Sequence, residues 1–288
     1  MIDALIITLR ETLEASLIIS FLLIFSKVQG LSFKWLIYAL IVGLIIAFVF
    51  AQQMPEISEL GDGIGQEVLQ SGILFCIAMT LLIIQFFIAI RENNNLSINS
   101  LLKASQPNNN QTSSSHPNFN QYSDNAFSYY YGLAISTAIS LEGAEIMIYM
   151  HSQLQISENT APSITGGFLG LGIGISMAVI FYYLLTQIIP KYGVLFSRIF
   201  IILISAAMLS QSLTFLMQAG LIESDLPYWN SNWIVSETSF IGQILYSLVG
   251  YESTPTFSQV VLYISTIILA FISPLIHAKY NSRLSTDA

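Results

Sequence analysis

The chain has 288 residues, of which 54% are apolar and only 9% are Asp, Glu, Lys or Arg. Soluble domains carry about 25% charged residues, so this composition excludes a soluble enzyme. The nine Lys and Arg residues are also too few to form a nucleic-acid-binding surface. The apolar residues fall in long continuous blocks, and the single cysteine, Cys76, excludes an intrachain disulfide framework. The sequence therefore predicts an all-α polytopic membrane protein.

Seven apolar segments are long enough to cross a bilayer, which takes about 20 helical residues. The predicted spans are 4–26, 35–52, 68–90, 128–150, 166–189, 194–219 and 258–278. Residues 240–251 are apolar but too short to span, so we expect an interfacial or re-entrant helix there. The first span is not a cleavable signal peptide, because it lacks a basic leader and charged residues interrupt it.

Basic residues gather on one side of the predicted spans. Eight of the nine Lys and Arg residues lie in the loops after the first, third and fifth spans or after the seventh. Because cytoplasmic loops are enriched in Lys and Arg, we predict an outside N-terminus and a cytoplasmic C-terminus. Most acidic residues outside the spans lie on the opposite face, which would attract cations.

The segments divide into five predicted parts. Residues 1–90 form a first three-helix repeat, and residues 91–126, rich in Asn and Ser, form a disordered cytoplasmic linker. Residues 127–219 form a second three-helix repeat of opposite orientation. Residues 220–257 form an extracytoplasmic loop with the short interfacial helix, and residues 258–288 form the seventh helix and a cytoplasmic tail. This is the pattern of a 3+3 inverted-repeat transporter with one added C-terminal helix.

Apart from Arg198 at the border of the sixth span, five charged residues lie inside the predicted spans: Arg10, Glu11, Glu14, Glu142 and Glu145. Each glutamate pair has the spacing Glu-x-x-Glu, which puts both carboxylates on one helix face. Each such residue costs roughly 2.5–3.5 kcal/mol near the bilayer centre, so the group is expected to be functional. Crowded carboxylates favour a hard, oxygen-seeking cation, and Arg10 can pair with Glu14. A polar cluster that only fixes helix packing is the alternative interpretation.

The same residues resemble a known family. The run Arg10-Glu11-Thr12-Leu13-Glu14-Ala15 resembles the Arg-Glu-x-x-Glu signature of the high-affinity iron permeases, the oxidase-dependent iron transporters. Leu141-Glu142-Gly143-Ala144-Glu145 falls where that family carries its second signature, in helix 4. The stretch from Gln66-Glu67 to Gly72 is also similar, as are tail residues Trp229, Gly242, Leu245, Gly250-Tyr251, Pro255 and Tyr263.

The resemblance implies a seven-helix permease that imports iron across the plasma (inner) membrane. By position, Glu11, Glu14, Glu142 and Glu145 would be the metal ligands, with Arg10 orienting or balancing them. Iron would be the transported substrate, with no permanently bound cofactor. The family often works with an extracytoplasmic oxidase or iron-delivery protein, which is the implied partner.

One departure from the family pattern is Leu141, which stands where the second signature has Arg. The site here is therefore more negative, which leaves open a different metal preference, coupling to protons, or a divergent branch. Glu56, Glu59 and Glu67 lie on the predicted outer face and are candidates for metal access to the site. Three other functions stay open: transport of another divalent metal, an intramembrane enzyme using carboxylate acid–base chemistry, and a non-transporting metal sensor.

Overall fold

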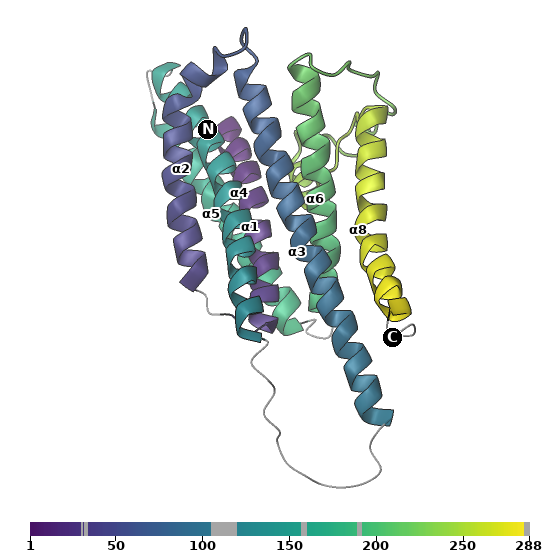
Figure 1. The fold of residues 1–288 in the computed structure, drawn as a ribbon. Helices are drawn as coiled ribbons and strands as arrows, with labels where there is room; N and C mark the ends of the chain where they lie inside the picture. The colour runs from purple at the N-terminus through teal and green to yellow at the C-terminus, as the bar shows by residue number, and fades with distance from the viewer. Residues whose placement is uncertain (30, 32–33, 105–119, 157–159, 189–191, 285–288) are drawn as a thin grey trace.

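The computed structural model describes all residues except 30, 32–33, 105–119, 157–159, 189–191 and 285–288, and its described residues are helical apart from connecting segments. The helices, in chain order, are α1 (Ile2–Val28), α2 (Lys34–Ser58), α3 (Gly65–Ala104), α4 (Asn120–Ile156), α5 (Ala161–Tyr183), the π-helical turn η1 (Leu184–Ile188), α6 (Gly193–Gln218), α7 (Phe240–Val249) and α8 (Phe257–Leu284). The long helices run roughly side by side as one bundle (Figure 1).

Helix α1 is the most enclosed element of the bundle. It contacts α4, α5, α6 and α7, and its buried residues lie all around its axis. Leu17, Phe21 and Phe25 of α1 belong to the main apolar core, together with residues of α3, α4 and α6. Glu11 and Glu14, in the middle of α1, therefore lie inside the protein.

Helices α2, α5 and α8 form the periphery and present large apolar side chains outward. Ile45 of α2 is 59% exposed, Phe168 of α5 is 73% exposed and Leu269 of α8 is 66% exposed. Contact of such large apolar surfaces with water would be unfavourable, whereas lipid tails would cover them. This distribution fits helices that face a bilayer.

Six helices are long and apolar enough to cross a membrane, counted over the residues that the structure describes. They are Lys34–Ser58, Gly65–Ile90, Ser128–Gln153, Ala161–Gln187, Gly193–Gln218 and Phe257–His277. They match six of the seven predicted spans. Helix α1 has 27 residues and is long enough, but Arg10, Glu11 and Glu14 interrupt its apolar sequence, and the seventh span stays a prediction.

Two helix pairs pack closely through glycine, α1 with α5 and α2 with α4. A Cβ added at Gly170 of α5 would lie 2.5 Å from the Leu5 carbonyl oxygen of α1. A Cβ added at Gly43 of α2 would lie 2.9 Å from the Ile139 Cβ of α4. Because only a residue without a side chain permits these approaches, glycine sets the spacing in both pairs.

Helices α3 and α6 are joined by a reciprocal hydrogen-bond pair. The Ser71 hydroxyl donates to the Ser212 carbonyl oxygen at 2.9 Å, and the Ser212 hydroxyl donates to the Ser71 carbonyl oxygen at 3.0 Å. Both serines are buried. The contact is therefore symmetric, because each serine donates one hydrogen bond to the other helix and accepts one from it.

The segment between α6 and α8 folds back into the bundle. It leaves α6 at the end that holds the N-terminus, and its short helix α7 packs against α1 and α6. The Ser239 side chain caps α7 by accepting from the Gly242 backbone N–H at 3.1 Å, and Gly250 ends the helix with φ +68°. Helix α7 lies where a short helix was expected, and it reaches the middle of α1.

The segment 91–126, expected to be a disordered linker, is partly helical. Helix α3 continues to Ala104 and α4 begins at Asn120. The intervening residues 105–119 lie outside the described part of the chain.

Candidate metal centre

Three of the predicted ligands meet where α1 faces α4. One carboxylate oxygen from each of Glu11, Glu142 and Glu145 lies within 4.8 Å of the others. Glu11 is 5% exposed and Glu142 is 3% exposed. Oxygens at this spacing need only small side-chain rotations to reach the distances of about 2.0–2.6 Å that hard divalent cations prefer. The three carboxylates can therefore converge on one cation.

The fourth predicted ligand, Glu14, lies one helical turn along α1 and is paired with Arg10. The Arg10 Nε donates to the Glu14 Oε1 at 3.3 Å and lies 3.9 Å from the Glu11 Oε1. Glu14 is 7% exposed but is not one of the three oxygens that cluster. The structure thus divides the predicted four-glutamate site into a group of three and an ion pair.

The Glu142 carboxylate is incompletely satisfied. Its Oε1 is buried and has no hydrogen-bond partner among the described residues. A buried carboxylate oxygen without a donor is costly, because water would otherwise solvate it. A bound cation would supply the missing partner.

Three polar residues that the sequence analysis did not assign as site residues complete the centre. The Gln70 amide of α3 donates to Glu145 at 2.8 Å. The Gln211 amide of α6 donates to the Tyr246 hydroxyl at 2.5 Å, and the Arg10 guanidinium carbon lies 4.2 Å from the centre of the Tyr246 ring. Glutamine and tyrosine in apolar helices give no spacing signal, and Gln70 was included only as part of the similar stretch that begins at Gln66.

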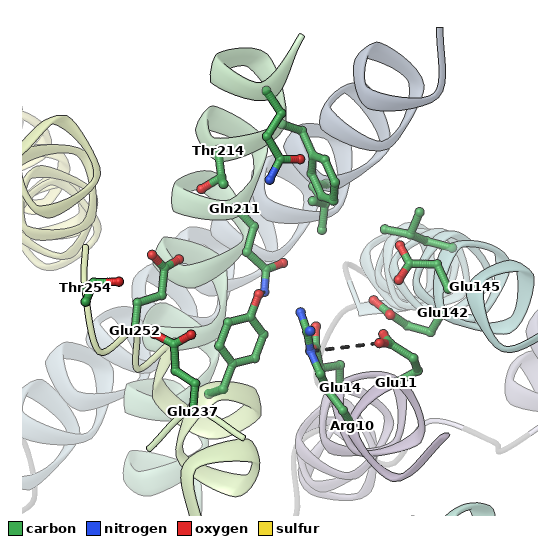
Figure 2. Close-up of a pocket in the computed structure, with 15 residues that line it drawn as sticks. Arg10, Glu11, Glu14, Glu142, Glu145, Gln211, Thr214, Glu237, Glu252 and Thr254 are labelled. Atoms are coloured by element: carbon green, nitrogen blue, oxygen red, sulfur yellow. Dashed lines mark hydrogen bonds and ion pairs between the residues drawn. The ribbon is translucent and has the colours of Figure 1, made fainter. Parts of the chain in front are cut away.

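The centre opens into a cavity of about 370 Å³. Its walls include Gln218, which ends α6, and Glu237 and Glu252 of the segment between α6 and α8. In Figure 2 Arg10 lies between these two glutamates on one side and Glu142 with Glu145 on the other. The cavity therefore approaches the centre from the end of the bundle where the N-terminus lies.

Leu141 lines the same cavity. It is 3% exposed and precedes Glu142 as Arg10 precedes Glu11. The α4 half of the centre therefore presents a neutral side chain where the α1 half presents a cation.

The remaining candidates lie away from this cavity. Glu56 and Glu59 are exposed near the end of α2. Glu67 lies in the first turn of α3, where its Oε2 is buried and has no hydrogen-bond partner among the described residues. None of the three is among the residues that line the cavity. Their role in metal access remains a prediction.

Residues 1–283 match the model of the Iron permease FTR1 family. The chain belongs to the Iron permease FTR1 family. The match covers both Glu-x-x-Glu helices and the tail, so it confirms the resemblance seen in the sequence. With its apolar helices, the chain is a multi-pass membrane protein of an iron-transport family, and this family is one of transporters rather than enzymes. Among curated proteins and among solved structures, none matches the chain.

Proposed function

We propose that this protein imports iron ions across the plasma membrane through a site formed by Glu11, Glu142 and Glu145. The observation that carries the proposal is the convergence of three carboxylate oxygens within 4.8 Å, on two helices of an iron permease family member. An all-oxygen, anionic site suits hard cations such as iron better than soft ones. Glu14 and Arg10 would balance the charge of the site before and after an ion binds.

The proposed direction of transport is inward, from the end of the bundle that holds the N-terminus. The cavity reaches that end, and the acidic residues Glu237 and Glu252 line it. Lys27 in the last turn of α1 and Lys34 at the start of α2 lie at the other end of the bundle. Their positive charge favours the cytoplasm on that side. An inside-negative membrane potential would supply about 4.6 kcal/mol per 100 mV for a divalent ion, twice the value for one charge.

We also propose that helices α1–α3 and α4–α6 form an inverted 3+3 repeat, with α1 as a transmembrane helix. The first helix of each half packs on the second helix of the other half, since α1 packs on α5 and α4 packs on α2. The reciprocal contact of Ser71 with Ser212 joins the third helix of each half. In such transporters the substrate binds between the repeats, where Glu11 meets Glu142.

Radiolabelled iron uptake by proteoliposomes containing only the purified chain tests the proposal. Ferrous and ferric iron are supplied separately, with an inside-negative potential. Replacing Glu11, Glu142 or Glu145 with Gln keeps the shape of the side chain and is expected to abolish uptake. Glu223→Gln, at an exposed glutamate that does not line the cavity, is the matched control and should transport normally.

Normal uptake by the Glu142→Gln and Glu145→Gln variants would refute the assigned site. Uptake by the purified chain alone would show that an oxidase or iron-delivery protein is not needed for the transport step itself.

Transport of another divalent metal is the second candidate, and Leu141 favours testing it. The neutral Leu141 leaves the α4 carboxylates without the cation that the family signature carries there, so the site attracts other hard cations as well. Competition of manganese or zinc with iron in the same uptake assay distinguishes the two. Stronger inhibition by manganese than by unlabelled iron would favour the second candidate.

A further inference from the structure

Arg10 contacts two different kinds of partner at once. Its Nε lies 3.3 Å from a Glu14 oxygen and 3.9 Å from a Glu11 oxygen, and its guanidinium carbon lies 4.2 Å from the centre of the Tyr246 ring. Carboxylates attract the guanidinium by charge, and the ring face attracts it through its π electrons. The position of Arg10 is therefore a balance between the carboxylates and the ring.

Helix α7 holds the Tyr246 ring in a fixed place. The Gln211 amide of α6 donates to the Tyr246 hydroxyl at 2.5 Å. The Ser239 cap fixes the start of α7, and at its other end Gly250 packs against Ala207 of α6 so tightly that no side chain fits. Helix α7 is therefore anchored to α6 at two points, Tyr246 and Gly250, which restrain the ring if Arg10 moves.

Arg10 can compete with a metal ion for the Glu11 carboxylate. A guanidinium stays protonated in proteins, so Arg10 can give way to a cation only by moving and not by losing its charge. Glu11 belongs to the group of three converging carboxylates and is also within 3.9 Å of Arg10. If nothing held Arg10 back, a full ion pair with Glu11 would oppose metal binding.

We propose that Tyr246 is a positioning residue that holds Arg10 on the Glu14 side of the centre and so keeps Glu11 available to the metal. This inference rests on the proposed iron site. The α4 half needs no such residue, because Leu141 offers no competing cation there. Helix α7 belongs to neither group of three helices, so the ring acts on one half of the centre alone.

Ferrous iron binding to the purified full-length chain, measured by anaerobic calorimetry, tests the inference. Tyr246→Leu removes the ring and should raise the Kd for iron about tenfold, since a desolvated cation–π contact has about that effect. Tyr246→Phe and Tyr246→Trp keep a ring face and should restore the Kd to within about threefold of the original value. Tyr246→Met, an unbranched replacement, takes the place of Tyr246→Leu if the latter does not fold.

A double-variant cycle identifies Arg10 as the intermediary. In an Arg10→Gln background there is no cation to hold back. Tyr246→Leu should then change the Kd less than twofold, which is about the experimental uncertainty of a double-mutant cycle. An equal rise in Kd in both backgrounds would overturn the inference, because Tyr246 would then act independently of Arg10. An unchanged Kd in the single Tyr246→Leu variant, or a Tyr246→Phe variant as weak as Tyr246→Leu, would overturn it as well.

Failure of the underlying iron site gives a different result. If the original chain does not bind iron, or if Glu142→Gln binds it with the original Kd, the proposed function fails before the Tyr246 variants are compared. If both behave as expected, the cycle tests Tyr246 alone.

Discussion

The Gln70 side-chain amide on α3 donates a hydrogen bond of 2.8 Å to the Glu145 carboxylate on α4. Gln70 is 5% exposed, so no water replaces this contact freely. The bond links α3, which carries none of the three clustered carboxylates, to α4, which carries two of them. It holds the Glu145 carboxylate in one orientation within the cluster.

Gln70→Leu should therefore weaken iron transport without unfolding the protein. Partners that orient a metal ligand typically account for about 10–100-fold in metal affinity or activity, so we expect the KM for iron uptake to rise about tenfold. Gln66→Leu, one helical turn away and lining a different cavity, is the matched control. Equal uptake kinetics for the two variants would contradict an orienting role for Gln70.

Gly170→Ala should destabilise the protein, because its Cβ would lie 2.5 Å from the Leu5 carbonyl oxygen and 2.9 Å from the Leu9 nitrogen of α1. Backbone atoms cannot move aside as a flexible side chain can, so α1 and α5 must separate. We expect a loss of about 1–3 kcal/mol, typical of overpacking, seen as a lower Tm in detergent.

Gly172→Ala on the same helix provides the control, since an added Cβ there meets nothing within 4 Å. Alanine is the better helix former by up to about 1 kcal/mol, so this variant should keep or raise the Tm. A similar fall in both variants would show that close packing at Gly170 is not the cause.

Glu252 should make folding stability depend on pH. It lies between α7 and α8, outside the membrane-spanning helices, where burial raises its pKa above the usual value of a glutamate. The folded chain then binds a proton more readily than the unfolded chain, so this contribution to stability is present at low pH and is lost as the pH rises through the folded-state pKa.

The Glu252→Gln variant is expected to lose that part of the pH dependence, because glutamine does not titrate and can still accept the hydrogen bond that Gln259 donates at 2.8 Å. Tm values measured from about pH 4 to about pH 8 bracket the change. The exposed Glu223→Gln variant should follow the original curve. Coinciding curves for Glu252→Gln and the original chain would contradict a raised pKa in the folded state.

Leu141→Arg should weaken iron binding. The new guanidinium would enter the cavity beside Glu142 and Glu145 and compete with the metal for their carboxylates. We expect the KM for iron uptake to rise at least several-fold, whereas the volume-conserving Leu141→Met should transport normally. Tighter iron binding by Leu141→Arg would instead indicate that the second cation assists the site.

The sequence predicted the apolar helices and the residues of the centre because both leave strong local signals. Charges are so rare in these helices that Glu11 and Glu142 stand out, and the Glu-x-x-Glu spacing puts each pair on one face. The separation of Glu14 from the other three glutamates depends on how α1 faces α4. The spacing of residues along the sequence does not reveal this orientation. Tyr246 and Gln70 were not foreseen as site residues, because uncharged polar residues are common in such helices and their partners lie far away in the sequence.

The enclosure of α1 has a consequence for how this protein is made. Ser16 of α1 hydrogen-bonds to the Gly174 carbonyl oxygen of α5, across 158 residues of sequence. At about 5–20 residues per second, the ribosome takes roughly 8–30 s to supply that partner. During this time the segment with Arg10, Glu11 and Glu14 has entered or waits beside the membrane without the helix that covers most of it. A chain truncated before α5 would therefore leave the charged helix α1 without the neighbour that it contacts most.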